Sequence, residues 1–432
     1  MKNYVSCFVI CFFLGLQACS IAITQERPPN IVFIMADDLG YECITANGGN
    51  SYNTPHINRL AKQGMRFTHC YAQPKCTPSR VQLMTGQYNV RNYTRFRELE
   101  RSQITFAQLL KNAGYKTAIA GKWQLGTQKD SPQHFGFDES CLWQQSLPRT
   151  DDKGHDTRYV NPILEYNGVV TQLDNGAYAP DVVSDYLCDF IDKNKDVPFL
   201  AYYSMILTHC PFTPTPESEA WDPNAKGSLD YVGKTKYFPD MVSYMDKMVG
   251  KIISKIDTLG LSENTLIIFT GDNGTDQPIT SVYLNKKYTG GKSKTTDNGT
   301  HVPMIARWSG RIESNVLYEG LVDFSDFFPT FCELAGVEIP NNLPMDGISF
   351  LPQLLGHKSP SRNWIYSWYE HKGKVTKFAR NTVYKLYGNG RFYDVNKDFN
   401  EENALSTNQL NPNQKQQFET LQEVLDHYNE IR

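Results

Sequence analysis

The sequence predicts an α/β fold, in which a large and mostly parallel sheet is sandwiched by helices and followed by a smaller C-terminal subdomain with an antiparallel sheet. Continuously apolar runs alternate with helical segments between about residues 30 and 335, which is typical of a parallel sheet covered on both faces. After about Pro340 the apolar runs shorten and turn residues separate them, as in antiparallel strands. The length of 432 residues suits two or three domains, and we expect a main domain over residues 28–340 and a subdomain over residues 341–432.

Residues 30–36 form the first predicted strand, because the run after Asn30 is continuously apolar and therefore belongs in the middle of a sheet. The first helix begins after Thr54, a candidate N-cap followed by a proline, and ends at Gly64. The alternation continues with strands over residues 116–120, 199–204, 265–270 and 302–307 and helices over residues 79–85, 105–112, 181–192, 241–259 and 325–335. In the subdomain we expect strands over residues 364–368, 377–380, 383–387 and 391–395 and a polar helix over residues 414–428.

The composition excludes several classes of protein. The 43 basic residues nearly balance the 46 acidic residues, so the chain lacks the positive charge of a general nucleic-acid binder, and we expect no nucleic-acid partner. Hydrophobic residues make up 40% of the chain, which excludes a disordered chain. Ten cysteines in 432 residues are too few for a disulfide scaffold.

Residues 1–22 have the pattern of an export signal. Lys2 is followed by an apolar stretch over residues 4–16 and by the small residues around Cys19. Residues 16–19 also resemble a bacterial lipobox, in which Cys19 would carry a lipid anchor, although Gln17 is unusual there. Simple cleavage and lipidation both stay open. We expect an exported protein, either in a bacterial periplasm or attached to the outer membrane as a lipoprotein.

Two acidic clusters follow buried strands. Asp37 and Asp38 come directly after residues 30–36, and Asp272 and Asn273 follow the strand that ends near residue 270. The carboxyl ends of strands are where open α/β sheets bind their ligands. Converging carboxylates need a cation to neutralise them, and oxygen ligands favour Ca²⁺ or Mg²⁺. Each pair could instead cap a helix or turn.

A cysteine lies just before a predicted helix, in the segment Cys76-Thr77-Pro78-Ser79-Arg80. The N-terminus of a helix stabilises anions through its free N–H groups, and Ser79 could cap it. Arg80 adds a cation nearby. The alternatives are that Cys76 is a small buried apolar residue or that Cys70 is its disulfide partner.

Several separate segments of this sequence resemble the motifs of type I sulfatases, a family of the alkaline-phosphatase-like superfamily. The Cys-x-Pro-x-Arg segment matches the family's maturation signature. Order and spacing agree over about residues 28–394. The segments are residues 30–41, 76–80, 121–126, 208–212, 270–274 and 291–297.

The resemblance implies an alkaline-phosphatase-like fold and hydrolysis of sulfate esters. It implies that a formylglycine-generating enzyme oxidises Cys76, and that the hydrate of the formylglycine is the nucleophile. The cations around the sulfate oxygens would be Arg80, Lys122 and Lys292, and His209, with Lys292, would protonate the leaving alcohol. One ion, Ca²⁺ rather than Mg²⁺, would be held by Asp37, Asp38, Cys76, Asp272 and Asn273.

Gln124 departs from the family pattern, because relatives usually have a histidine there that helps to expel sulfate. Glutamine forms hydrogen bonds but cannot exchange a proton near neutral pH. Either another group acts as the base, or Gln124 only binds a sulfate oxygen.

We expect the substrate to be a carbohydrate sulfate, such as a glycosaminoglycan or another sulfated glycan. Residues 143–178 contain Trp143, Arg149, Arg158 and Tyr159, which could contact a sugar or form a solvated loop. One alternative is a phosphate or phosphonate ester hydrolase of the same superfamily. Another is a catalytically dead glycan-binding surface lipoprotein, for which Gln124 is the sequence hint.

Overall fold

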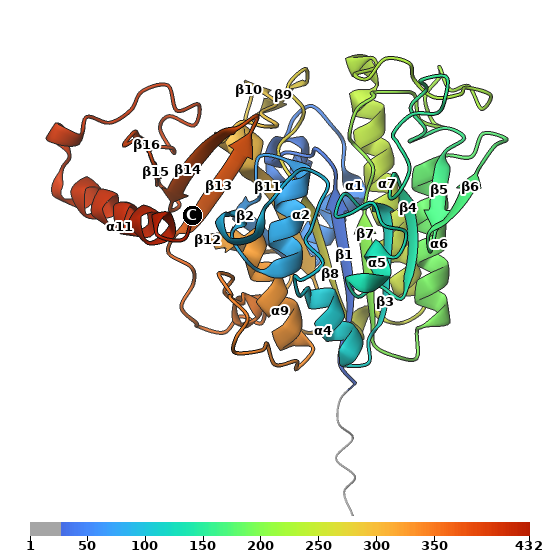
Figure 1. The fold of residues 1–432 in the computed structure, drawn as a ribbon, viewed down its shortest axis with the longest axis horizontal. Helices are drawn as coiled ribbons and strands as arrows, with labels where there is room; N and C mark the ends of the chain where they lie inside the picture. Colours follow the sequence, from blue (N-terminus) through green and yellow to red (C-terminus); the bar gives the residue numbers. More distant parts are fainter. Residues whose placement is uncertain (1–26) are drawn as a thin grey trace, which may run out of the picture.

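A ten-stranded sheet forms the centre of the main domain in this computed structural model, which describes residues 27–432 (Figure 1). The strand order is β12-β2-β11-β8-β1-β7-β3-β4-β5-β6. The predicted export signal, residues 1–22, lies outside the described residues. The strands are β1 (Asn30–Ala36), β2 (Met65–Tyr71), β3 (Lys116–Lys122), β4 (Glu139–Trp143), β5 (Ile163–Tyr166), β6 (Val169–Gln172), β7 (Phe199–Ser204), β8 (Thr265–Gly271), β11 (His301–Arg307) and β12 (Val316–Asp323).

The middle of the sheet is parallel and its flanks are mixed. β1 pairs in parallel with β7 and β8, and β3 pairs in parallel with β7 and β4. β11 instead runs antiparallel to both β8 and β2, and β4, β5 and β6 are antiparallel to one another. The predicted α/β class with a mostly parallel sheet is confirmed. The sequence analysis did not find five strands of this sheet, β2, β4, β5, β6 and β12. Each of them has polar residues or is only partly buried, so it lacks a continuous apolar run.

Helices cover both faces of the sheet because successive side chains of the central strand point to opposite sides. Phe33 belongs to an apolar core with Val81 of α2 and Phe331 of α9. Its neighbour Ile34 belongs to a second core with Leu187 of α6. The helices are α1 (Pro55–Lys62), α2 (Cys76–Thr85), α3 (Asn89–Asn92), α4 (Phe106–Asn112), α5 (Ser131–His134), α6 (Ala179–Lys193), α7 (Phe238–Thr258), α8 (Asp297–Thr300), α9 (Phe327–Leu334), α10 (Leu351–Leu354) and α11 (Pro412–Asn429).

The C-terminal residues form a separate antiparallel sheet, β13-β14-β15-β16, with α11 packed against it (Figure 1). Its strands are β13 (Ile365–His371), β14 (Lys374–Arg380), β15 (Tyr384–Tyr387) and β16 (Phe392–Asp394). The four strands and the helix predicted in this part of the chain are all present. Tyr366 and Leu386 share an apolar core with Ile31, so the sheet is packed onto the main domain and the boundary near residue 340 stays a prediction.

A hairpin and several polar contacts connect the two sheets. The hairpin consists of β9 (Thr280–Tyr283) and β10 (Lys286–Thr289). After it, the segment that leads into β11 is held by the C-terminal sheet: Arg380 forms an ion pair with Asp297, and Lys385 donates to the backbone carbonyl of Thr295. This segment begins directly after Lys292, so the C-terminal sheet supports the backbone beside a predicted site residue.

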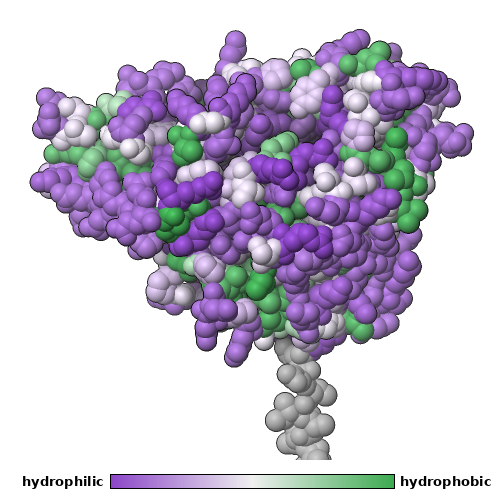
Figure 2. Space-filling view, in the orientation of Figure 1, coloured by the Kyte–Doolittle hydropathy of each residue, from purple (hydrophilic) through white to green (hydrophobic). Residues whose placement is uncertain are grey.

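The face of the molecule drawn in Figure 2 is mostly hydrophilic, and its apolar residues lie in small separate groups. Within residues 27–432, no helix combines the length and the apolarity that a bilayer crossing requires.

Candidate active site

The two predicted acidic clusters meet at the carboxyl ends of β1 and β8. These strands are parallel neighbours in which Ala36 is paired with Gly271, so the residues that follow them emerge side by side. The backbone N–H of Asp38 donates to Oδ1 of Asp272 over 3.1 Å, and Nδ2 of Asn273 donates to Oδ1 of Asp38 over 2.8 Å. The structure therefore brings together the four side chains that the sequence places in two distant segments.

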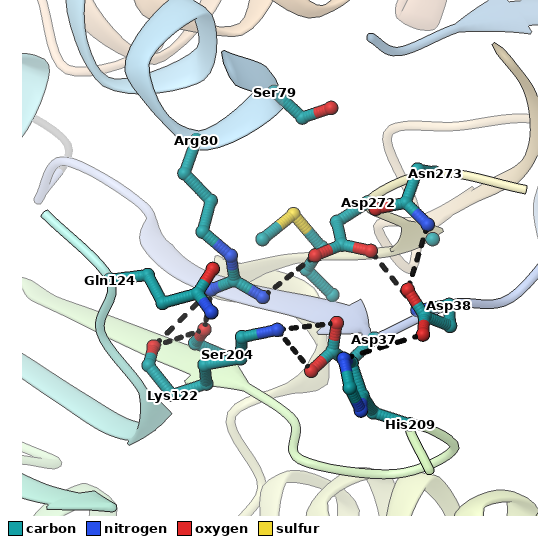
Figure 3. A network of polar contacts seen from close by, with 12 residues as sticks. Asp37, Asp38, Ser79, Arg80, Lys122, Gln124, Ser204, His209, Asp272 and Asn273 are labelled. Carbon is teal, nitrogen blue, oxygen red and sulfur yellow. Dashed lines mark hydrogen bonds and ion pairs between the residues drawn. The ribbon is translucent and has the colours of Figure 1, made fainter. Parts of the chain in front are cut away.

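Each buried carboxylate of this cluster has a basic partner (Figure 3). Nζ of Lys122 lies 2.8 and 2.6 Å from the two carboxylate oxygens of Asp37. Arg80 forms an ion pair of 2.9 Å with Asp272. Burial raises the pKa of Asp37, and Lys122 opposes this by favouring the charged form. Without these cations the cluster would be an uncompensated buried charge.

Lys292 pairs with Asp38 in the same way. Burial alone would lower the pKa of Lys292, but the Asp38 carboxylate outweighs it and raises that pKa well above its ordinary value. The three predicted cations, Arg80, Lys122 and Lys292, therefore each contact a different carboxylate of the cluster.

A hard divalent cation fits this donor set. Oδ1 of Asn273 is buried and has no hydrogen-bond partner among the described residues, which is a costly state for an amide oxygen. Side-chain atoms of Asp37, Asp38 and His209 lie within 4.8 Å of one another. Carboxylate and amide oxygens are the ligands that Ca²⁺ and Mg²⁺ prefer.

Cys76 is the first residue of α2, and not a residue before the helix as the sequence analysis expected. Lys75 occupies the N-cap position, and Ser79 is not a cap: its hydroxyl accepts from the backbone N–H of Gln73. All ten residues of the helix are buried, and Cys76 and Arg80, four positions apart, lie on the same face of it. The seven cysteines among residues 27–432 are all free, so Cys70 is not a disulfide partner of Cys76.

Burial raises the pKa of the Cys76 thiol, and the nearby Lys122 opposes this only in part. Cys76 is 2% exposed and lies in the wall of a cavity of about 490 Å³. The same wall contains Lys122, Gln124, His209 and Lys292. Asp37 and Asp38, the partners of Lys122 and Lys292, are buried and are not among the residues of the cavity wall.

His209 lies between two cations. Its Nε2 is 3.0 Å from Nζ of Lys292 and 3.6 Å from Oδ2 of Asp38, and Arg158 donates to its Nδ1. Burial, Lys292 and Arg158 together lower the pKa of His209 well below its ordinary value. The ring is therefore neutral near pH 7. Nδ1 faces the Arg158 guanidinium and the Cys210 carbonyl, and Nε2 faces the Lys292 ammonium and the Asp38 carboxylate, so each ring nitrogen has a donor and an acceptor beside it.

Arg158 is the main residue of this site whose role the sequence analysis did not predict. It belongs to the segment that the sequence analysis expected either to contact a sugar or to form a solvated loop. It is buried, lines the cavity and lies 4.3 Å from the ring centre of Trp143, which lines the cavity as well. Its position in sequence, 51 residues before His209, gives no signal of this contact.

Gln124 lies in the cavity wall and is held by Thr77. The Thr77 hydroxyl accepts a hydrogen bond from the backbone N–H of Arg97 over 3.3 Å, and its own proton is available to donate a second hydrogen bond. Its acceptor is Oε1 of Gln124, also at 3.3 Å. This arrangement fixes the amide of Gln124 with its NH₂ group as the part that is free to bind in the cavity.

Comparisons with known proteins show which proteins this chain is similar to. The family model "Sulfatase" matches residues 29–337, and the model "N-sulphoglucosamine sulphohydrolase, C-terminal" matches residues 291–429. Arylsulfatase A of Homo sapiens is 32% identical over 409 residues, which are 86% of this chain and 77% of the relative. N-acetylgalactosamine-6-sulfatase of Mus musculus is 30% identical over 380 residues, covering 80% of this chain and 70% of the relative.

A solved structure titled "Crystal structure of Ps i-CgsB in complex with k-i-k-neocarrahexaose" has the same fold. It superposes with a TM-score of 0.77 and 26% sequence identity, and the match covers 93% of each chain.

Proposed function

Because this chain belongs to the sulfatase family of the alkaline-phosphatase-like superfamily and is a sulfuric ester hydrolase, we propose that it removes sulfate from saccharides, with formylglycine at position 76 and a bound Ca²⁺ ion. The observation that carries this proposal is the cavity itself: Cys76 lies in its wall, beside Lys122 and Lys292 and in front of the cluster of carboxylates. One curated relative is named for a sugar sulfate, and one structural neighbour holds an oligosaccharide.

The family's nucleophile requires that the thiol of Cys76 be converted by a formylglycine-generating enzyme that acts on the Cys76–Arg80 segment. Formylglycine, once present, supplies a hydroxyl group as its hydrate, and Ca²⁺, once bound, supplies positive charge next to the sulfate oxygens. The ion would be held by Asp37, Asp38, Asp272, Asn273 and the side chain at position 76.

The side chains of the cavity wall have separate tasks around the sulfate group. Lys122 and Lys292 present ammonium groups to the sulfate oxygens while they remain paired with Asp37 and Asp38. Arg80 fixes Asp272 from behind. A sulfate ester already carries negative charge on its oxygens, so fixed cations of this kind are what an incoming oxygen nucleophile requires.

The leaving alcohol takes a proton as its bond to sulfur breaks. His209, with Lys292, is the donor, because both side chains line the cavity and Nε2 of the ring is 3.0 Å from Nζ of Lys292. Gln124 binds sulfate and does not act as a base. Its Oε1 accepts from Thr77, and its NH₂ group donates a hydrogen bond to a sulfate oxygen.

We further propose that the protein is exported by the signal over residues 1–22, to a bacterial periplasm or, with a lipid on Cys19, to the outer membrane. Mass spectrometry of the mature N-terminus from the native host separates the two: a free terminus supports simple cleavage, and a diacylated Cys19 supports the anchor. A chain that still begins at Met1 contradicts export.

The central experiment combines two measurements on protein produced together with a formylglycine-generating enzyme. Mass spectrometry of the tryptic peptide around Cys76 is expected to show an aldehyde or its hydrate. The same preparation is expected to release sulfate from defined sulfated oligosaccharides, whereas Cys76→Ala protein releases none. An unmodified thiol in a protein that still releases sulfate would contradict the proposed nucleophile.

Two alternatives predict different results in the same assays. A phosphate or phosphonate hydrolase would cleave an aryl phosphate faster than the matched aryl sulfate. A glycan-binding protein without activity would bind sulfated oligosaccharides but release no sulfate even when position 76 is fully converted.

A further inference from the structure

Arg97 is a basic side chain of the cavity wall without an acidic partner. It lies on the loop between α3 and α4 and is partly buried. Its one side-chain hydrogen bond joins NH2 to the backbone carbonyl of Gln144 over 3.2 Å, and its Nε is buried with no partner. Within residues 27–432 it forms no ion pair.

Four other arginine and lysine side chains of the cavity wall are paired with carboxylates. Lys122 and Lys292 contact Asp37 and Asp38. Arg149 and Arg158 share Oδ2 of Asp156, at 2.8 and 3.5 Å. Arg97 therefore differs from them in having donors that no carboxylate occupies.

The backbone holds Arg97 in this position. Its φ of 65° is in the left-handed region, which is unfavourable for a residue with a side chain, and Gln144, to which it is bonded, has a φ of 55°. Its N–H is fixed to Thr77, the residue after Cys76. Two strained residues, joined to each other and to the start of α2, keep the guanidinium at the cavity wall.

A second basic residue is close to this position. Lys75, the N-cap of α2, also lines the cavity and lies with its Nζ 5.2 Å from the ring centre of Phe96. Like Arg97, it forms no ion pair in the part of the chain that the structure describes. This side of the cavity consequently has two cations and no carboxylate partner for either.

Burial lowers the pKa of Arg97, with Glu165 opposing this from a distance. The guanidinium has thus lost water without gaining a counter-ion, and an anionic ligand would compensate that loss. A guanidinium can bind a carboxylate or a sulfate through two parallel hydrogen bonds. The cavity of about 490 Å³ is also much larger than one sulfate group and has room for the sugar that bears it.

We propose that Arg97, with Lys75, binds a second anionic substituent of the saccharide, a carboxylate or another sulfate, while the scissile sulfate lies beside position 76. This inference rests on the proposed function and narrows its substrate class to saccharides that carry at least two anionic groups near each other. A planar carboxylate and a tetrahedral sulfate are both oxyanions that a guanidinium can bind, and the experiment below distinguishes them.

The test uses three saccharides with the same scissile sulfate and a neighbouring carboxylate, a neighbouring second sulfate, or no second charge. The measured quantity is selectivity, the ratio of kcat/KM for a doubly charged saccharide to that for the singly charged one. In Arg97→Gln we expect selectivity to fall about tenfold, through KM more than kcat, which corresponds to about 1.4 kcal/mol. Arg97→Lys, which keeps the charge but loses the two-pronged hydrogen bonding, is expected to lie between.

Arg95→Gln is the matched control. Arg95 is two residues away on the same loop, its side chain is 74% exposed, and it pairs with Glu98 at the surface. We expect it to keep the wild-type selectivity. Isothermal titration with Cys76→Ala protein measures the binding of the same saccharides without turnover and covers the case in which Arg97→Gln lowers overall activity by loosening the loop.

The outcomes separate this inference from the proposed function. A selectivity loss for the carboxylate, the sulfate or both supports the subsite and identifies its ligand. Equal selectivity in wild type and Arg97→Gln, with sulfate released from all three saccharides, overturns the subsite and leaves the sulfatase activity intact. No sulfate release by the wild type from any saccharide, with position 76 converted, contradicts the proposed function instead.

Discussion

The hydroxyl of Thr77 donates a hydrogen bond to Oε1 of Gln124, 3.3 Å away. This contact joins the residue after Cys76 to the position at which the resemblance to type I sulfatases implies a histidine. It leaves Gln124 with donors only for a ligand in the cavity. The substitution of histidine by glutamine therefore changes a group that could exchange a proton into one that can only bind.

Replacing Thr77 tests this contact directly. In Thr77→Val the amide of Gln124 loses its orientation and the N–H of Arg97 loses its acceptor, so we expect kcat/KM for a sugar sulfate to fall about fivefold to tenfold, equivalent to about 1 kcal/mol. Thr77→Ser keeps the hydroxyl and is the control, expected to retain activity. Equal rates in Thr77→Val and wild type would show that the contact has no catalytic role.

A charge change at Gln124 tests whether its NH₂ group binds sulfate. Gln124→Glu has the same shape and still accepts from Thr77, but it places a carboxylate oxygen where the amide donor was. We expect kcat/KM to fall about 100-fold, because like charges in a buried site repel by a few kcal/mol, about 2.7 in this case. Gln124→His, the residue of relatives, is expected to remain active. Full activity of Gln124→Glu contradicts the assigned role.

Arg158 acts through His209, so the fall in kcat on replacing Arg158 should depend on how much protonation the leaving group needs. In Arg158→Gln the ring of His209 loses the guanidinium that contacts Nδ1 and fixes its orientation, and we expect kcat for a sugar sulfate to fall about 100-fold. An aryl sulfate with an acidic phenol needs little protonation, and its kcat should fall less than tenfold. His209→Ala should show the same split. A uniform loss with both kinds of substrate would indicate a structural role for Arg158 only.

Removal of divalent cations should abolish activity and lower the midpoint of thermal unfolding. The buried Oδ1 of Asn273 has no partner in the protein, and the carboxylates around it repel one another without a cation. We expect a chelator to remove activity and Ca²⁺ to restore it more fully than Mg²⁺. Asn273→Ala, which lacks that oxygen, should require a higher Ca²⁺ concentration. Activity that is insensitive to chelation, with no metal found by elemental analysis, would exclude the ion.

His301 should contribute to the loss of stability in acid. It is stacked on Tyr41, with 4.0 Å between ring centres, and burial lowers its pKa to about 4. Its ordinary pKa is about 6.5, so between pH 6.5 and 4 the unfolded chain binds a proton that the folded chain refuses. The free energy of unfolding therefore falls as the pH falls through this window, by up to about 3 kcal/mol.

The check is chemical denaturation at several pH values. His301→Phe keeps a stacked ring that cannot be protonated, and the pH dependence of its free energy of unfolding between pH 4 and 6.5 should be weaker than that of the wild type. His357, which is exposed, is the control position. An unchanged pH dependence in His301→Phe would mean that other groups cause the acid sensitivity.

The central strands and the acidic clusters could be predicted because their signals are local. β1 is buried at each of its seven residues and apolar after Asn30, and Asp37 and Asp38 follow it directly in the sequence. Once β1 and β8 are both assigned to the middle of a parallel sheet, the proximity of Asp38 and Asp272 follows from the rule that ligands bind at the carboxyl ends of strands.

The parts that sequence did not predict depend on contacts between distant loops. Arg158 and His209 lie 51 residues apart, and Arg97 meets Gln144 across 47 residues. No periodicity or motif records such pairs, because they form only when the loops pack over the sheet. The reversed direction of β11 is similar: its apolar run reads alike in either orientation.

The C-terminal sheet supports the segment that follows Lys292, because Arg380 pairs with Asp297 and Lys385 donates to the carbonyl of Thr295. Deleting the last ninety or so residues would therefore misplace Lys292 and impair the active site, although none of the deleted residues takes part in the reaction. Engineers who graft this pocket onto a new scaffold, or shuffle tails between relatives, would have to move both pieces together.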